Sequence, residues 1–202
     1  DVVYLRPDGD DGADGHSVGT AWKSLARALG GLEPGRTAYL APGNYAAPGA
    51  ISLRGTAEKP IRLASRTWEL VTVEGDVTFS GAAHLVLDSI RFTGSVTVAE
   101  GSDIRFENCT FEGKSGGLTV RGTRNLRVEQ ALFRGAGPYA IALKASPGAL
   151  LRGNLYGNRN GPALIVDDAD SIRYADYNGF GDGSRTWAIG DGSGKPLAEV
   201  QP

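Results

Sequence analysis

The sequence predicts an all-β solenoid, in which short strands wind as stacked coils around one apolar core. Five segments of the chain align on one another, and Phe92, Phe111, Phe133 and Tyr156 occupy one column of that alignment, 19, 22 and 23 residues apart. A fixed period of this size is typical of repeat proteins, in which each unit buries its apolar face against its neighbours. The 30 glycines and 10 prolines among 202 residues also indicate many turns between short strands.

Residues 1–50 precede the repeat and predict a cap for one end of the stack. Val2–Leu5 has the composition of a strand, and Thr20 is a candidate N-cap for an amphipathic helix. The apolar positions of that helix are Trp22, Leu25, Ala26 and Leu29. A helix laid across an open solenoid end would cover unpaired backbone groups and apolar side chains.

Residues 51–180 contain the coils, and residues 181–202 are predicted to form an irregular C-terminal segment of the same structural domain. Apolar and polar residues alternate in each coil, which predicts three short strands per coil with parallel pairing between coils. One inward column is predicted to hold Leu87, Phe106, Val128, Leu151 and Tyr174. A second inward column is predicted to hold Ile90, Cys109, Ala131, Asn154 and Tyr177.

The coil sequence IRFENCTFEG, with Asn108 at a tight turn, and the opening YLRPDGDDGADG are the motifs that carry a family likeness. On them the chain resembles the right-handed parallel β-helix (pectate-lyase-like) superfamily, which includes chondroitinase B and alginate lyases. The resemblance implies a right-handed parallel β-helix with an N-terminal amphipathic helix cap. It also implies a secreted protein, extracellular or periplasmic, whose partner is a polysaccharide, expected to be acidic.

Composition excludes two other classes of partner. The net charge is −2 and the 21 basic residues are scattered, so we expect no binding to nucleic acid. No apolar run approaches the roughly 18 residues that span a bilayer, so we expect no membrane insertion. Further domains of a longer chain are an additional expected partner.

Candidate catalytic residues follow one strand of each coil. The resemblance to polyuronate lyases implies a Lys or Arg base, and Lys144 with Arg121 one coil below it matches that requirement. The alternative is a surface ladder in which Arg121, Lys144 and Asp167 partly compensate one another. The strand face at Thr78, Thr97 and Thr119 carries no carboxylate pair, which argues against a hydrolase there.

A second ladder contains Asp88, Glu107, Glu129 and Arg152. Stacked carboxylates repel one another unless a cation or a basic side chain lies close to them. We expect cross-strand salt bridges to Arg105 and Arg127, with a bound cation as the alternative.

Two loop regions are candidate ligand sites. Tyr139, Asn158, Arg159 and Asn160 are predicted to line a sugar groove, because aromatic rings and guanidinium groups suit acidic saccharides. Asp167, Asp168 and Asp170 form an acidic turn that could hold Ca²⁺, the one cofactor that the sequence suggests. The alternative for that turn is a purely structural role.

Two functions therefore stay open. The first is a secreted β-helix domain that binds polysaccharide without catalysis, alone or as part of a larger protein. The second is a lyase-type enzyme that cleaves an acidic, uronate-containing polysaccharide by β-elimination through Lys144 and Arg121. The small number of coils favours the first, and the sequence leaves open whether the protein is an enzyme.

Overall fold

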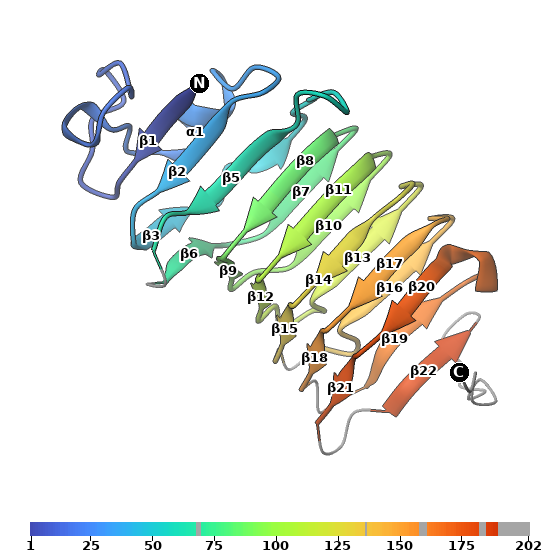
Figure 1. Cartoon of the computed structure of the whole chain (residues 1–202). Helices are drawn as coiled ribbons and strands as arrows, with labels where there is room; N and C mark the ends of the chain where they lie inside the picture. The colour runs from blue at the N-terminus through green and yellow to red at the C-terminus, as the bar shows by residue number, and fades with distance from the viewer. Residues whose placement is uncertain (68–69, 136, 158–160, 182–184, 190–202) are drawn as a thin grey trace.

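The computed structural model describes residues 1–67, 70–135, 137–157, 161–181 and 185–189. Its strands form three parallel sheets, each of which runs along the stack from coil to coil (Figure 1). Strand β1 lies at one end of the stack and β22 at the other. The predicted all-β parallel solenoid is confirmed.

The first sheet has 8 strands, and it carries the site described below. Its strands, in spatial order, are β1 (Val2–Leu5), β2 (Thr37–Leu40), β5 (Ile61–Ser65), β8 (Ala83–Asp88), β11 (Ser102–Glu107), β14 (Arg127–Glu129), β17 (Ala149–Arg152) and β20 (Ile172–Asp176).

The second and third sheets have 7 strands each. The second contains β4 (Gly49–Ile51), β7 (Val77–Ser80), β10 (Val96–Ala99), β13 (Leu118–Arg121), β16 (Ile141–Lys144), β19 (Pro162–Val166) and β22 (Arg185–Ile189). The third contains β3 (Gly43–Ala46), β6 (Val71–Glu74), β9 (Ile90–Phe92), β12 (Thr110–Phe111), β15 (Leu132–Phe133), β18 (Leu155–Tyr156) and β21 (Gly179–Phe180).

An aromatic column runs through the core behind the third sheet. Ring centroids lie 5.5 Å apart between Phe92 and Phe111, and 4.6 Å apart between Phe111 and Phe133. Tyr156 stacks on Phe133 at 5.3 Å, and Phe180 stacks on Tyr156 at the same separation. The predicted column is confirmed and extends one coil further. Parallel in-register pairing causes this stacking, because it places equivalent side chains directly above one another.

A buried amide continues the inward column that begins at Ile90. Asn154 is only 1% exposed. Its side chain accepts a hydrogen bond from the Ala131 amide and donates one to the Val128 carbonyl, both at 2.9 Å. The polar side chain is therefore satisfied in the core, and the inward position predicted for Asn154 is confirmed.

The N-terminal helix differs from the prediction. Helix α1 covers only Leu25–Leu29, and its N-cap is Ser24, whose hydroxyl accepts a hydrogen bond from the Arg27 amide at 3.1 Å. The predicted N-cap, Thr20, ends a separate 3-10 turn. Trp22 is excluded from the helix because its amide donates to the carbonyl of Tyr4 in β1.

Strand pairing extends beyond the predicted coil region at both ends. Strands β1 to β3 precede residue 51, β4 begins at Gly49, and all four already belong to the three sheets, while β22 follows residue 180. A second 3-10 turn, Ala169–Ser171, leads into β20. The division of the chain at residues 50 and 180 stays a prediction.

The inward positions predicted for Tyr174 and Tyr177 are wrong. These side chains are 43% and 74% exposed. Between β17 and β20 the register shifts, so that Leu150 pairs with Tyr174 and Leu151 pairs with Ala175. Because side chains alternate in direction along a strand, a shift of one residue moves a side chain from the core to the surface.

The stability of the fold is expected to depend on the aromatic column. Phe111 is fully buried and contacts rings in the coils on both sides. We expect Phe111→Ala to lower the free energy of unfolding by about 3–5 kcal/mol, because it leaves a cavity in the stack. Urea denaturation measures this change, with exposed Lys114→Ala as the matched control. A loss below about 1 kcal/mol for Phe111→Ala would contradict the role given to the column.

Candidate functional site

One column of residues runs along the outward face of the whole first sheet. Strand pairing places Tyr4 beside Tyr39 at the N-terminal end. The column then continues through Ala64, Asp88, Glu107, Glu129, Arg152 and Asp176. The predicted ladder from Asp88 to Arg152 is thus confirmed as part of a longer one, with neighbouring members about 4.8 Å apart at the backbone.

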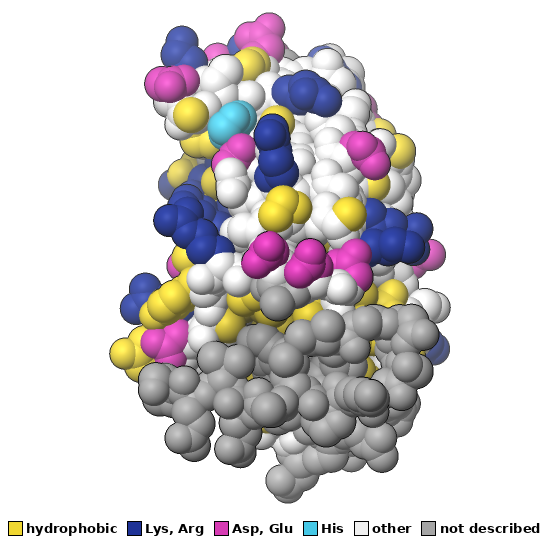
Figure 2. Space-filling model, turned by 90° about the vertical axis from the view of Figure 1, so that its right-hand side faces the viewer, with side chains coloured by type: hydrophobic (Ala, Val, Ile, Leu, Met, Phe, Trp, Pro, Cys, Tyr) yellow, Lys and Arg dark blue, Asp and Glu magenta, His cyan; other side chains and the backbone are white. Residues whose placement is uncertain are grey.

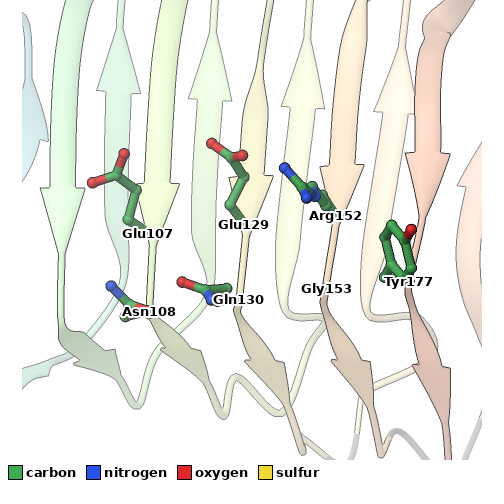
Figure 3. Close-up of a pocket in the computed structure, with 7 residues that line it drawn as sticks. All are labelled: Glu107, Asn108, Glu129, Gln130, Arg152, Gly153 and Tyr177. Carbon is green, nitrogen blue, oxygen red and sulfur yellow. The ribbon is translucent and has the colours of Figure 1, made fainter.

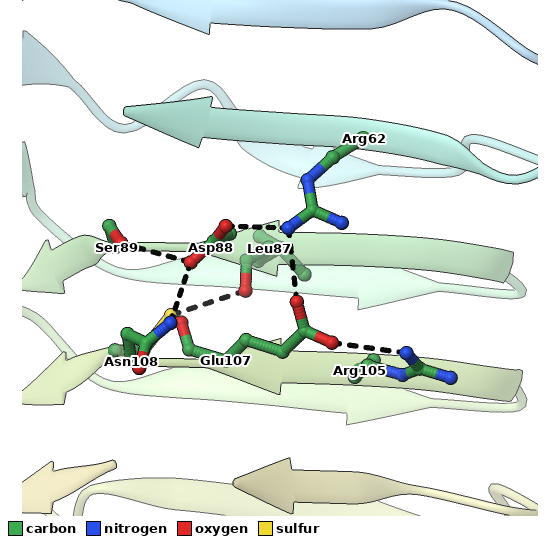
Figure 4. Close-up of polar contacts among 8 residues, drawn as sticks. Arg62, Leu87, Asp88, Ser89, Arg105, Glu107 and Asn108 are labelled. Carbon is green, nitrogen blue, oxygen red and sulfur yellow. Dashed lines mark hydrogen bonds and ion pairs between the residues drawn. The ribbon is translucent and has the colours of Figure 1, made fainter. Parts of the chain in front are cut away.

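Basic side chains neutralise two of the stacked carboxylates (Figure 4). Arg62 donates hydrogen bonds to both Asp88 and Glu107, the latter at 3.1 Å. Arg105 donates to the other oxygen of Glu107 at 3.0 Å. The Arg105 pair lies within strand β11, so it is not the cross-strand bridge that was predicted, and Arg127 has no ion-pair partner among the described residues. The cross-strand ion pairs come from Arg62, which was missed. The signal was present in the sequence, since Arg62 has the same place in Ile-Arg-Leu as Arg105 has in Ile-Arg-Phe.

Asp88 is held as the carboxylate by its neighbours. Burial opposes its ionisation, but hydrogen bonds from Asn108, Arg62 and Ser89, together with the charge of Arg62, outweigh burial and lower the pKa of Asp88 below its ordinary value. The Asn108 side-chain amide and the Ser89 hydroxyl donate to one oxygen, at 3.0 and 2.9 Å. This part of the ladder is therefore a fixed, internally paired network.

An open groove of about 530 Å³ follows the paired network along the same face (Figure 3). Three of its residues, Glu107, Glu129 and Arg152, end strands β11, β14 and β17. The other lining residues lie in the turns that follow, and they are Asn108, Gln130, Gly153 and Tyr177. Within the described residues, Glu129 has no ion-pair partner, and the guanidinium of Arg152 lies 5.8 Å from the Tyr177 ring.

The floor of the groove is set by a row of left-handed turn residues. Asn108, Gln130, Gly153 and Tyr177 have φ values of 53°, 54°, 65° and 55°. Asn and Gly adopt this conformation readily, whereas a residue such as Tyr does so at a cost of about 1–2 kcal/mol. Tyr177 keeps it because its amide donates to the Asp176 carboxylate at 2.7 Å. The last member of this row is Tyr177, which follows Asp176 of the outward column.

The groove combines hydrogen-bond acceptors, a guanidinium donor and an exposed aromatic ring. Carboxylate and amide oxygens accept hydrogen bonds from sugar hydroxyls, and Arg152 donates to hydroxyl or carboxylate oxygens. The exposed Tyr177 ring offers an apolar face with a polar edge. Tyr174, also exposed, donates its hydroxyl to Asp176 at 2.9 Å and lies on the neighbouring strand β20.

Arg121 and Lys144, the predicted catalytic pair, lie outside this groove. They are exposed register neighbours at the ends of β13 and β16 in the second sheet. Among the described residues neither side chain has a hydrogen-bond or ion-pair partner. Their catalytic role stays a prediction.

The residues predicted to bind sugar are only partly described. Tyr139 is half-buried, and its hydroxyl forms a 2.8 Å hydrogen bond with the Thr119 hydroxyl on β13. Asn158, Arg159 and Asn160 lie outside the described residues. Tyr139 does not line the groove of Figure 3.

Two of the predicted calcium ligands are engaged by backbone amides of the chain. The Asp167 carboxylate accepts hydrogen bonds from the Ala145 amide at 2.8 Å and from the Ser171 hydroxyl at 3.4 Å. Asp168 accepts from the Asp170 amide at 3.1 Å. Within the described residues, no three His, Cys, Asp or Glu side chains converge as a metal site would require. Calcium binding by Asp167, Asp168 and Asp170 stays a prediction.

One face of the described residues carries charges of both signs. On the face of Figure 2, the part drawn in colour carries both basic and acidic side chains, and three acidic ones lie in a row across its middle. This agrees with the net charge of −2. None of the helices in the described part of the chain is long and apolar enough to cross a membrane.

Comparisons with known proteins identify the fold. No family model matches this chain, and no curated protein sequence does. Among solved structures, a rhamnogalacturonan lyase superimposes with a TM-score of 0.70 at 14% identity, over 96% of this chain and 64% of its own. A GH136 lacto-N-biosidase from Eubacterium ramulus gives a TM-score of 0.60 at 12% identity, over 94% of this chain and 54% of its own.

The catalytic domain of a GH87 alpha-1,3-glucanase, solved with tetrasaccharides, gives a TM-score of 0.50 at 13% identity, over 76% of this chain and 40% of its own. The chain therefore has the pectate-lyase-like parallel β-helix fold. It spans less than two thirds of each of these neighbours. At such identities the likeness is one of fold, and a shared fold does not imply a shared function.

The Asp88 network predicts a specific pH dependence of stability. A carboxylate whose pKa is lowered on folding stabilises the folded state above its ordinary pKa of 3.8, and this contribution is lost as the pH falls through the lowered value. We expect Asp88→Asn to be less stable than the parent at neutral pH and to lose less stability between about pH 5 and about pH 2.

Urea unfolding at several pH values measures this difference, and Glu74→Gln, at an exposed position, is the control. Parallel pH profiles for the parent and Asp88→Asn would show that the network does not hold Asp88 ionised.

Proposed function

We propose that the protein is a secreted β-helix domain that binds a polysaccharide along the outward face of its first sheet. The observation that carries this proposal is the groove itself, in which Glu129, Arg152 and Tyr177 stand free of the paired network and face the same open space. The three solved neighbours support a carbohydrate ligand, since their names describe enzymes that act on rhamnogalacturonan, a lacto-N-biose unit or an α-1,3-glucan.

An acidic polysaccharide fits the charges of this face best. The paired network already neutralises Asp88 and Glu107. Within the described residues, Arg127 and Arg152 have no ion-pair partner, so their guanidinium groups are free to bind carboxylates. A guanidinium binds a carboxylate through two parallel hydrogen bonds, which favours uronate sugars over neutral ones.

Binding without catalysis is the function that the geometry supports best. The alternative is a lyase that removes a proton with Lys144 beside Arg121 and eliminates the glycosidic oxygen. The observation that favours it is that both cations are exposed register neighbours without an acidic partner among the described residues. It is weaker than the first proposal because these two residues do not line the groove of Figure 3.

The N-terminal segment is proposed to close one end of the stack. Leu25 and Ala28 of α1 are buried and belong to the same core cluster as the coils. We infer that this short helix performs the capping role that the sequence suggested.

Ca²⁺ is retained as a proposed ligand of the turn at Asp167. Titration of the protein with Ca²⁺ would test whether the ion binds there.

Variants of the groove test the proposed function. We expect Tyr177→Ala to weaken binding of alginate or polygalacturonate oligosaccharides by about threefold to tenfold, the value of one aromatic contact. Arg152→Gln is expected to weaken it by about tenfold or more, because it removes a charge-assisted pair. Isothermal titration calorimetry measures both, and Lys144→Gln is the matched control, expected to bind as the parent does.

The same samples distinguish the enzymatic alternative. Incubation with each polysaccharide is followed by absorbance of the unsaturated product and by release of new reducing ends. Product formation that disappears in Lys144→Gln and survives in Tyr177→Ala would establish the lyase and overturn the proposed site. Absence of binding to every polysaccharide tested would overturn the proposed function altogether.

A further inference from the structure

A second cavity lies on the same sheet, near its N-terminal end. Its volume is about 310 Å³, and it shares no lining residue with the groove of Figure 3. Two tyrosines and two arginines form its polar wall, namely Tyr4, Tyr39, Arg6 and Arg66. Val18, which is 56% exposed, contributes an apolar wall.

The two tyrosines form an aromatic platform. Tyr4 and Tyr39 are register neighbours on β1 and β2, and their ring centroids lie 6.3 Å apart. Their neighbours in each strand alternate into the core, so both rings point outward and are only half-buried. Within the described residues, neither phenol hydroxyl has a hydrogen-bond partner, so both are available to a ligand.

The exposed Arg66 side chain places a positive charge beside this platform. Its guanidinium carbon lies 5.7 Å from the Tyr4 ring centroid and 5.3 Å from that of Tyr39. These contacts involve the face of the guanidinium. Its N–H donors lie in the guanidinium plane and are therefore available to a ligand. In the described part of the chain Arg66 has no acidic partner, whereas Arg6 is paired with Asp8 at 3.0 Å.

We propose that this cavity is a second binding subsite, for a sugar that carries a carboxylate or a sulfate. The Arg66 guanidinium would bind the anionic group, the tyrosine hydroxyls would bind sugar hydroxyls, and the rings would contact the apolar face of the sugar. The inference rests on the proposed function, because it extends the same polysaccharide track to a second position.

The register of the first sheet connects the two positions. Tyr39, Ala64, Asp88 and Glu107 are successive members of one column, so the platform and the start of the groove are three strand spacings apart. At about 4.8 Å per strand this is about 14 Å. Ala64, which is 2% exposed, and the Arg62–Asp88 ion pair lie between them. One polysaccharide chain that occupies both positions would bind more tightly than a short fragment can.

Stoichiometry separates the two subsites. Trigalacturonate, a short acidic probe, is titrated into the full chain by calorimetry, with cellotriose as the neutral comparison. We expect two equivalents of trigalacturonate to bind the parent protein. We expect Arg66→Gln to bind one equivalent fewer, or to bind the second equivalent with an affinity at least about tenfold lower, since a charge-assisted pair is lost. Cellotriose is expected to bind this subsite at least tenfold more weakly.

Two further variants complete the test. Tyr39→Leu removes one ring of the platform without removing the charge, and it is expected to weaken trigalacturonate binding at the same subsite as Arg66→Gln does. Tyr177→Ala is expected to weaken binding in the groove only. Circular dichroism and the urea midpoint establish that each variant is folded. Loss of stability in Arg66→Gln with unchanged binding would overturn the subsite, because Arg66 would then be purely structural.

The outcomes distinguish this inference from the proposed function. A single equivalent that is lost in Tyr177→Ala and retained in Arg66→Gln overturns the second subsite and leaves the groove intact. A single equivalent that is lost in Arg66→Gln and retained in Tyr177→Ala supports the subsite and overturns the groove. Absence of any binding by the parent overturns both.

Discussion

In-register stacking of inward apolar side chains is the constraint on which the rest of this structure depends. The column from Phe92 to Phe180 fixes the relative position of successive coils. Because side chains alternate along each strand, a fixed core also fixes which residues face outward. The outward column of the first sheet is therefore set by the same register as the core, and every site proposed above is a consequence of that register.

The departure from this register at β20 shows how sensitive the surface is to it. One extra residue between Ile172 and Tyr174 shifts the pairing with β17. The shift removes Tyr174 and Tyr177 from the core and exposes both rings on the outward side. The aromatic residue that lines the proposed sugar-binding groove thus arises from a local irregularity in an otherwise regular repeat.

The repeat could be predicted from the sequence because apolar and polar residues alternate within each coil. The aromatic column and the Asp88 to Arg152 ladder follow from this alternation. The helix start and the groove could not be predicted. Ser24, rather than Thr20, is the N-cap because Trp22 pairs with the first strand, which is a tertiary contact. The bulge before Tyr174 depends on pairing with the coil beneath. Without that extra residue the repeat assigns Tyr174 to the inward column, which is wrong.

The central claim is that a saccharide binds along the outward column of the first sheet. Backbone NMR of the isotopically labelled chain, titrated with an acidic oligosaccharide, tests it most directly. Shifts concentrated at Glu129, Arg152 and Tyr177, with a second group at Tyr39 and Arg66, are the expected result. Shifts centred on Arg121 and Lys144 of the second sheet, or an unchanged spectrum at saturating ligand, would contradict the claim.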